Sequence, residues 1–293
     1  MNATATTDTA REARQSLLAV RGFLHHKLAV TGLLVLLTLA VCCFGADWIA
    51  PYPRNAQDLL LGAAPPSGSH LLGTDELGRD YLSEVLYAGR ISLAIGLGVA
   101  ALSTTLGTVL GAVAGYVGGW VEEMIMRLTD LFLVVPGIAV LALALQGFGS
   151  SPFTIVLVLS GLGWTFIARV VRAQVLSLRE KEFIDAARVL GVPGFRILWR
   201  HLLPNLVGVI VVNVSLAVAG AVIIESTLSF LGFGIQPPRS SWGNMLSQAA
   251  GMVGTSKSYL LYAPGAAIVL TVLAVNFVGD GLRDTFSPQG GRR

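Results

Sequence analysis

Residues that could carry out catalysis or bind a metal are few in this chain, and they are badly spaced for either task. The four histidines lie on three separate segments, and none stands at a metal-ligand spacing from the neighbouring Cys42 and Cys43. The sequence contains no G-x-x-x-x-G-K-[ST] motif, which forms the backbone nest that holds nucleotide phosphates. We therefore predict that the chain is not an enzyme and that it binds no cofactor or metal of its own.

The most charged stretch is 177–205, SLREKEFIDAARVLGVPGFRILWRHLLPN, and its pattern predicts two short helices. Ser177 with Glu180 three residues later is a capping-box pattern, and Gly191 supplies a stop signal. A second helix is expected to start near Gly194. The residues predicted to share one apolar face of the first helix are Phe183, Ile184, Ala187 and Leu190.

An amphipathic helix at this place has two candidate partners. It could lie flat on the inner membrane leaflet, with its Arg and Lys side chains toward anionic head groups. It could instead dock into a groove on a soluble protein. The small pair Ala186 and Ala187 beside Asp185 suits close insertion into a protein, whereas lipid contact favours larger aliphatic side chains. Periodicity alone leaves both partners open.

The elements that must position this stretch are apolar and belong in a membrane. The 293 residues are 54% hydrophobic and 13% charged, whereas soluble proteins are about a quarter charged. A net charge of +3 is too small for a nucleic-acid surface. Runs long enough to cross about 30 Å of hydrocarbon are 28–46, 91–117, 128–147, 152–175, 204–226 and 259–280. We predict an all-α, polytopic membrane protein with six transmembrane helices, the first of them uncleaved.

The positive charges predict the orientation of these helices. Fifteen of the 20 Lys and Arg residues collect on one side, which includes both termini, and the other five lie on the opposite side. Both termini are therefore expected in the cytoplasm. The predicted division is a cytoplasmic segment 1–27, a first transmembrane helix 28–50, an extracytoplasmic segment 51–89, a permease core 90–282 with transmembrane helices two to six and a cytoplasmic loop 177–203, and a cytoplasmic tail 283–293.

Small and charged residues inside the spans carry further information. Four glycines of the second run recur at intervals of four and so share one helix face, where we predict close packing against another helix: Gly107, Gly111, Gly115 and Gly119. Ionisable groups are nearly absent from the span centres, and Asp130, Glu225 and Asp280 stand near predicted ends. This argues against a proton- or sodium-coupled carrier, which needs such groups along its path.

Four stretches together resemble one family. DAARVLG, followed by an Ile and then LLPN, resembles the EAA loop of prokaryotic ATP-binding cassette (ABC) importer permeases. Three others resemble the C-type permease subunit of dipeptide/oligopeptide importers: HLLGTDELGRDYLSEVLYAGRISL (70–93), ESTLSFLGFGIQPPRSSWGNML (225–246) and NFVGDGLRDTFSPQ (276–289). With the first span and the loop after it, the resemblance covers nearly the whole chain.

The resemblance implies a type I ABC importer permease architecture in which 178–191 is the coupling helix that seats in an ATPase subunit. Asp185, Ala186, Ala187 and Gly191 stand at the signature positions of the loop. Asp185 replaces the usual Glu, which keeps the charge and shortens its reach by one methylene. We expect Gly191 to end the helix in a left-handed conformation.

The partners that the resemblance implies are a homologous permease in a heterodimer, two cytoplasmic ATPases that bind ATP and Mg, an extracytoplasmic solute-binding protein, and the lipid of a prokaryotic inner membrane. The cargo it implies is di- or oligopeptides, moved by alternating access, with nickel or another small solute as the alternative. The rival from another class is a self-contained secondary carrier or channel, and a structural membrane scaffold is a third candidate.

Two features lie in the segments that are predicted to be outside the cytoplasm. The acidic residues that surround Arg79, among them Asp75 and Glu84, are expected to form a solvated, internally paired helix instead of a cation site. The turn made by Pro237-Pro238 with Trp242 is expected to shape an outward loop at the membrane interface, where Trp is favoured, or to contact the solute-binding protein directly.

Overall fold

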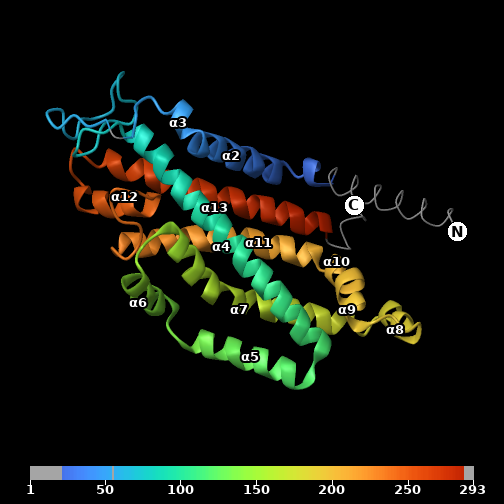
Figure 1. Ribbon diagram of the computed structural model, residues 1–293. Coiled ribbons are helices and arrows are strands. Elements are labelled where there is room, and N and C mark those ends of the chain that lie inside the picture. Colours follow the sequence, from blue (N-terminus) through green and yellow to red (C-terminus); the bar gives the residue numbers. More distant parts are fainter. Residues whose placement is uncertain (1–21, 55, 287–293) are drawn as a thin grey trace.

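The computed structural model describes residues 22–54 and 56–286, and over these residues the chain is folded into helices with one isolated β-bridge. Residues 1–21 of the expected N-terminal segment and 287–293 of the expected tail lie outside the described residues. Five helices are long and apolar enough to cross a membrane, and they form one bundle (Figure 1). They are α2 (Lys27–Phe44), α4 (Tyr81–Val117), α7 (Pro152–Leu178), α11 (Val207–Phe230) and α13 (Tyr259–Phe286).

The third expected span is not one straight helix. The run predicted at 128–147 is divided into α5 (Gly119–Val134) and α6 (Gly137–Phe148), which meet at an angle of 87°. Pro136 lies in the break. A proline has no amide donor and its ring clashes with the preceding turn, so the helix cannot continue through this position. The fold is the expected all-α membrane bundle, and its spans number six when this bent pair is taken as one crossing.

Helix α4 begins at Tyr81, well before the expected start at 91, because Asp80 caps it by accepting from the Ser83 amide. Arg79 pairs with Asp75 at 2.6 Å and with Glu84 at 3.3 Å, as the sequence predicted. The expectation of a solvated helix was wrong, since Glu84 is buried in the first turn of α4. Asp75 and Arg79 precede the helix.

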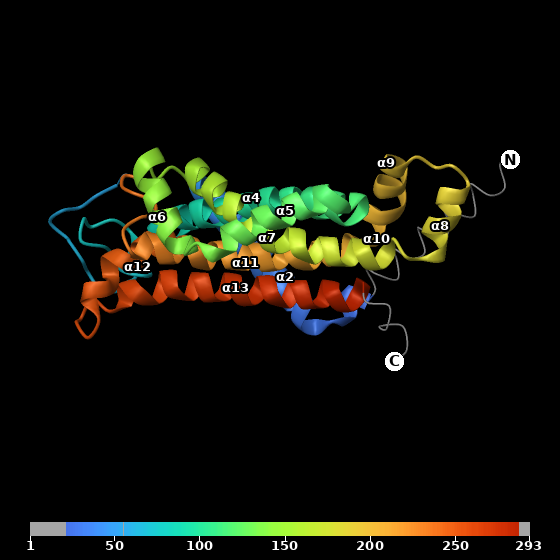
Figure 2. The same cartoon turned by 90° about the horizontal axis from the view of Figure 1, so that it is seen from below.

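The two ends of the bundle differ. One end, called the α12 end here, is made by residues 45–54, 56–80 and 231–258 with the adjoining turns of α4 and α13. It contains α3 (Ala46–Ile49), α12 (Trp242–Ala249) and η2 (Ala250–Met252). The other end carries an arm of short helices between α7 and α11, seen in two views (Figures 1 and 2).

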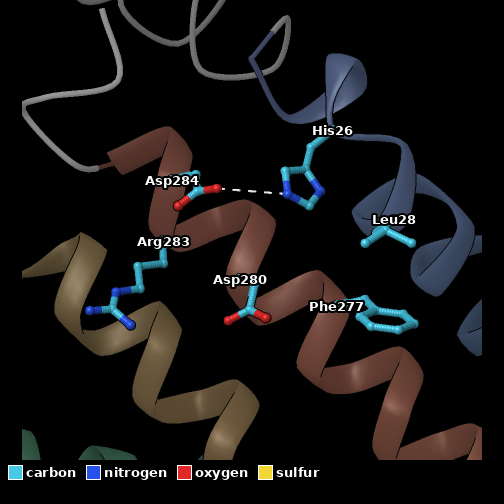
Figure 3. A pocket seen from close by; sticks show the side chains of 6 residues that line it. All are labelled: His26, Leu28, Phe277, Asp280, Arg283 and Asp284. Carbon is cyan, nitrogen blue, oxygen red and sulfur yellow. Dashed lines mark ion pairs between the residues drawn. The ribbon is translucent and has the colours of Figure 1, made fainter.

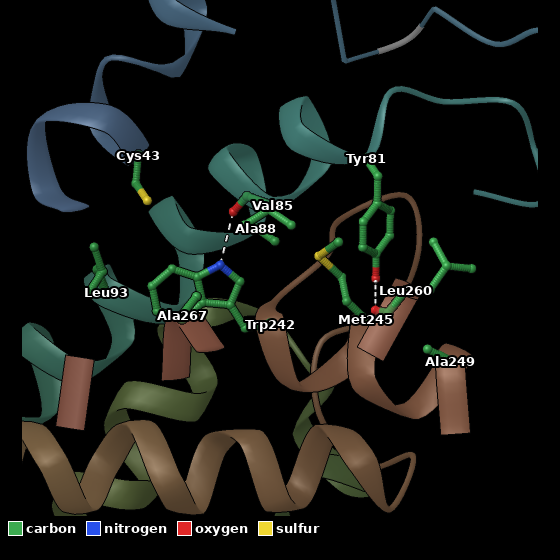
Figure 4. Packing of buried hydrophobic residues seen from close by; sticks show 10 residues of the cluster. All are labelled: Cys43, Tyr81, Val85, Ala88, Leu93, Trp242, Met245, Ala249, Leu260 and Ala267. Atoms are coloured by element: carbon green, nitrogen blue, oxygen red, sulfur yellow. Dashed lines mark hydrogen bonds between the residues drawn. The ribbon is translucent and has the colours of Figure 1, made fainter. Parts of the chain in front are cut away.

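Trp242 is the centre of the α12 end. Its side chain is fully buried among residues of α2, α4, α12 and α13, including Cys43, Val85, Met245 and Leu260 (Figure 4). The indole Nε1 donates to the Val85 carbonyl oxygen at 2.9 Å. The expectation that Trp242 lies at the membrane interface was wrong, because its side chain is buried inside the bundle.

The glycine face of α4 packs against α7. A Cβ atom added to Gly111 would lie 2.3 Å from the Ala168 carbonyl oxygen, and one on Gly115 would lie 2.9 Å from the Arg172 carbonyl oxygen. Gly107 is equally close to α7, at 2.7 Å from the Trp164 carbonyl oxygen. The backbones of α4 and α7 touch along this seam, so no side chain fits between them.

Gly119 does not belong to this seam, although its spacing predicted it. Helix α4 ends at Val117, and Gly118 and Gly119 adopt φ of 72° and 55° in the turn that leads into α5. Nothing lies within 4 Å of a Cβ atom on Gly119. Its role is conformational, because positive φ is available to Gly at low cost.

Candidate functional site

The arm, residues 179–206, is the candidate site. It contains α8 (Glu182–Val189), α9 (Gly194–Ile197), the π-helical turn η1 (Leu198–Leu202) and α10 (Leu203–Asn205). Helix α8 projects beyond the ends of α7 and α11 (Figures 1 and 2). The second helix starts at Gly194, as predicted.

The first helix of the arm starts later than its sequence pattern indicated. Helix α7 continues through Leu178, so Ser177 lies inside a helix and cannot cap a new one. Lys181 is the N-cap of α8, and its side chain makes no capping hydrogen bond. The capping-box prediction was wrong because the apolar run of α7 carries its helical ladder past Ser177.

The charges of α8 agree with its dipole. Glu182 and Asp185 lie in the first turn and Arg188 lies in the last, where each sign is favourable. Asp185 accepts from Arg188 Nη1 at 3.0 Å, and both side chains are solvent-exposed. The carboxylate at this signature position therefore has a partner within its own helix.

Gly191 ends α8 in the predicted left-handed conformation, with φ of 74°. Its amide donates to the Arg188 carbonyl oxygen at 2.9 Å, and the Val192 amide donates to the Ala187 carbonyl oxygen at 3.0 Å. These two bonds are those of a Schellman motif, which satisfies the last carbonyl groups of a helix. The turn directs the chain from α8 back to α9.

The predicted apolar face of α8 divides into two faces. Ile184 and Ala187 are buried in a cluster that includes Val171 and Val175 of α7 and Leu202 of the arm. Phe183 and Leu190 lie outside this cluster, and the Leu190 side chain is 81% exposed. A single docking face of four residues was therefore a wrong expectation, because two of its members fasten α8 to its own bundle.

The outer face of α8 carries apolar side chains that the described residues leave uncovered. Phe183, Ala186 and Leu190 follow one another at i, i+3 and i+7, and the neighbouring Val189 is 87% exposed. We call these four residues the outer patch. Val189 was missed by sequence reasoning because it lies off the stripe that contains Ile184 and Ala187. Its signal was an apolar residue two positions before the Gly191 stop.

Several contacts fix the base of the arm to α4. The Arg179 guanidinium Nη1 donates to the Gly115 carbonyl oxygen at 3.0 Å. A Cβ atom on Gly194 would lie 2.9 Å from the Tyr116 hydroxyl oxygen, so α9 packs directly on α4. Pro204 lies just after η1, and π-helical turns of this kind are frequent at functional positions. The base of the arm is thus in direct contact with α4.

A pocket of about 490 Å³ lies at the same end of the bundle, between the start of α2 and the end of α13. Figure 3 shows its lining, in which His26 Nε2 lies 3.7 Å from Asp284 Oδ2. Asp280 and Arg283 line the same pocket and are exposed. Within 22–54 and 56–286, no group of three or more His, Cys, Asp or Glu is arranged to hold a metal ion.

The charged residues of the spans do not all lie at helix ends. Asp130 is well inside α5 and is paired with Arg169 of α7, while Glu122 of α5 is paired with Arg172. Glu225 of α11 is fully buried and accepts from the Ser229 hydroxyl at 2.7 Å. The expectation that Asp130 lies near a span end was wrong, because α5 starts at Gly119, not at 128.

Comparison with known proteins places this geometry in a family. Residues 107–289 match the model of the binding-protein-dependent transport system inner membrane component, and residues 15–66 match the N-terminal TM domain of oligopeptide transport permease C. Relatives named oligopeptide transport system permease protein OppC occur in several bacteria. The protein from Escherichia coli K12 is 42% identical over 92% of this chain and 90% of its own length. Those from Haemophilus influenzae and Mycobacterium bovis are 40% identical (92% and 88% covered) and 38% identical (94% and 95% covered).

Proposed function

The chain belongs to the family of binding-protein-dependent transport system inner membrane components, and we propose that it translocates di- or oligopeptides as the C-type permease of an ABC importer. The family makes it a non-catalytic, multi-pass subunit of the inner membrane. The names of its relatives support the cargo, since they are oligopeptide permeases that match nearly the whole chain.

The observation that carries this proposal is the arm. Its outer patch is apolar and uncovered, and its inner residues Ile184 and Ala187 are buried against the bundle. A helix held on one side and uncovered on the other is suited to a soluble partner, for which we propose an ATPase subunit. The partner set is then two cytoplasmic ATPases with their ATP and Mg, a homologous permease, and a solute-binding protein.

The orientation follows from the same assignment. The arm, the start of α2 and the end of α13 lie at one end of the bundle. We propose that this end is cytoplasmic, with 47–90 and 227–258 outside, as the basic residues of both terminal segments favour. The α12 end would then receive the solute-binding protein, and a pocket of about 560 Å³ between Arg54, Asp75, Pro238 and Asn244 opens there.

In the proposed mechanism, the arm transmits the movement of the ATPases to the membrane-spanning helices. When the ATPases close, α8 moves with the subunit on which its outer patch sits. The buried contacts of Ile184, Ala187 and Gly194 pass the movement to α4 and α7, whose backbones touch along the glycine seam. Packed helices move as units because interiors are close to crystal density. The spans rock together and open the path outward.

Reconstitution of the complete transporter in lipid vesicles tests this function. The permease pair, the ATPases and the solute-binding protein are assembled with ATP inside, and uptake of a radiolabelled oligopeptide is followed. We expect uptake that requires ATP, the binding protein and the ATPases together. Peptide uptake by this chain without ATPases would indicate a secondary carrier or channel, and ATP-driven uptake of nickel in place of peptide would replace the cargo.

A further inference from the structure

Opposite charges meet on the surface of the bundle between α5 and α7. Arg169 Nη2 forms an ion pair with Asp130 Oδ1, and Arg169 Nε donates to the Thr129 hydroxyl at 3.2 Å. Nearer to the arm, Arg172 Nε donates to Glu122 Oε1 at 2.6 Å. These contacts join two helices that otherwise pack loosely, since Thr129 is the one buried residue of α5.

The Asp130–Arg169 pair lies within segments that are long and apolar enough to span a membrane. Arg169 precedes the last residue of α7 by nine positions, which is about 14 Å of helix. Asp130 follows the first residue of α5 by eleven positions, or about 16 Å. Both residues also lie inside the apolar runs 128–147 and 152–175 that predict spans, so the pair lies within the hydrocarbon layer.

The described residues leave both side chains of this pair partly exposed. The side chain of Asp130 is 54% exposed and that of Arg169 is 42% exposed. Charges at such depth are costly against lipid, so they face a bundle interior or a water-filled cavity. The face of α5 and α7 that carries them is therefore not a lipid face.

The break between α5 and α6 is a second, independent indication that this face is not in contact with lipid. The break between α5 and α6 begins five residues after Asp130, and Val134 beside it is 83% exposed. Nothing lies within 4 Å of a Cβ atom on Gly137. Non-helical backbone at membrane depth is tolerated where protein buries it or where it lines a water-filled cavity. Within the described part of the chain, this break is not buried, since Val135 is 47% exposed.

We propose that Asp130 and Arg169 line the water-filled solute path and are the groups that contact the charged ends of the transported peptide. The inference rests on the function proposed above. An α-ammonium group suits the Asp130 carboxylate, and a carboxylate suits the two-pronged guanidinium of Arg169. With no solute present, the two side chains neutralise each other. A bare dication would meet the repulsion of Arg169, so the pair favours a zwitterion over a metal.

Cysteine accessibility tests where this face points. The variants are made in the complete transporter, on a background lacking Cys42 and Cys43. The test variant is Phe166→Cys, because Phe166 is exposed one turn from Arg169 on α7. The control is Leu34→Cys on α2, where the native side chain is similarly exposed. We expect a membrane-impermeant thiol reagent to label position 166 and not position 34, and saturating peptide with binding protein to slow the labelling. An unlabelled position 166 in the assembled complex would show that the partner permease or lipid covers the face, and would overturn the proposal.

Charge variants test the contact with the solute. Asp130→Asn and Arg169→Gln should each lower ATP-driven peptide uptake by roughly tenfold, the effect of one lost charge-assisted contact, with ATPase attachment intact. The double exchange Asp130→Arg with Arg169→Asp rebuilds the ion pair in the reverse order. We expect it to assemble and still transport poorly. Restored uptake would show that the pair only braces α5 against α7.

Failure of this inference is separable from failure of the proposed function. Uptake by the unaltered transporter is read first, and a transporter that carries no peptide refutes the proposed cargo. If the unaltered transporter carries peptide and both single variants carry it equally well, the cargo stands and the assignment of Asp130 and Arg169 is overturned.

Discussion

The α12 end and the arm are built in opposite ways. At the α12 end, distant parts of the sequence are joined by buried bonds: the Tyr81 hydroxyl donates to the Leu260 carbonyl oxygen at 2.5 Å, and the Trp242 amide donates to the Ser92 hydroxyl at 3.1 Å. The arm is one continuous stretch, 179–206, in which α8 is fastened by the two side chains Ile184 and Ala187.

The two regions differ in how far contacts within the chain cover their apolar and polar side chains. The α12 end buries Trp242, and Glu225 in the adjoining part of α11 accepts from the hydroxyls of Ser92 and Ser229. The arm leaves Val189 and Leu190 almost fully exposed. Trp48 is exposed at the α12 end as well, but that end is joined by buried contacts between distant segments, whereas the described residues leave the outer patch of the arm uncovered.

The strongest test of this contrast is removal of the Trp242 side chain. Trp242→Ala should lower the free energy of unfolding by about 3–5 kcal/mol, because it leaves a cavity and takes the donor from the Val85 carbonyl. The matched control is Trp48→Ala, since the Trp48 side chain is 90% exposed. Melting of the purified protein, followed by circular dichroism, compares them. Equal melting temperatures for the two variants would contradict the account of the α12 end.

The glycine seam that connects the two regions gives the next largest effect. Gly111→Leu should force α4 and α7 apart and cost about 1–3 kcal/mol, so assembly or peptide uptake falls. Gly115→Leu should act in the same way. Gly220→Leu is the control, because open space surrounds that position on α11. A fully active transporter with Leu at both 111 and 115 would show that the seam carries no movement.

Backbone strain at Gly191 should weaken the binding of the ATPase subunits and leave the packing of the bundle unchanged. Gly191→Val forces a branched residue into a left-handed conformation, at a cost of about 1–2 kcal/mol. Gly254→Val imposes similar strain at the α12 end, where φ is 79°. Pull-down of the ATPases should fall for Gly191→Val alone, and solute-stimulated hydrolysis should fall with it. Loss of ATPase in both variants, or in neither, would remove the special status of the arm.

The smallest effect is expected at Asp185. Its ion pair with Arg188 is on the surface, so Asp185→Asn should cost only about 0.2–0.5 kcal/mol. Asp185→Glu, which installs the residue usual at this position, should be neutral. ATPase recovery from pull-downs at low and high salt measures both. A salt-dependent loss for Asp185→Asn would instead place the carboxylate in direct contact with a charge on the ATPase.

The sequence was informative where a pattern is local. Apolar runs predicted the spans by length alone, and Gly191 predicted its own left-handed turn. Trp242 was misplaced because its burial depends on α2, α4 and α13, which reach it from far along the chain. Pro136 was the visible signal of the broken span, but a run of apolar residues around it favoured one straight helix.

The site was predicted less completely than the fold. The stretch 177–203 was identified, yet periodicity could not tell which side of α8 faces inward, because both Ile184 and Leu190 are large and apolar. That choice depends on the packing of α7 and α9 against α8. The charge pair Asp130–Arg169 was missed because the two residues are distant in sequence and lie on different helices.

The central claim is that the outer side of α8 binds the ATPase while its inner side fastens the arm, and adjacent alanines separate the two. Ala186 is exposed, and Ala187 is buried in the bundle cluster. A pull-down of ATPase subunits with Ala186→Glu, alongside the melting temperature of the same protein, is the direct test. We predict unchanged melting with lost ATPase for Ala186→Glu, and lowered melting for Ala187→Glu. Normal ATPase recovery with Ala186→Glu would contradict the claim and would favour a helix that lies on the membrane surface.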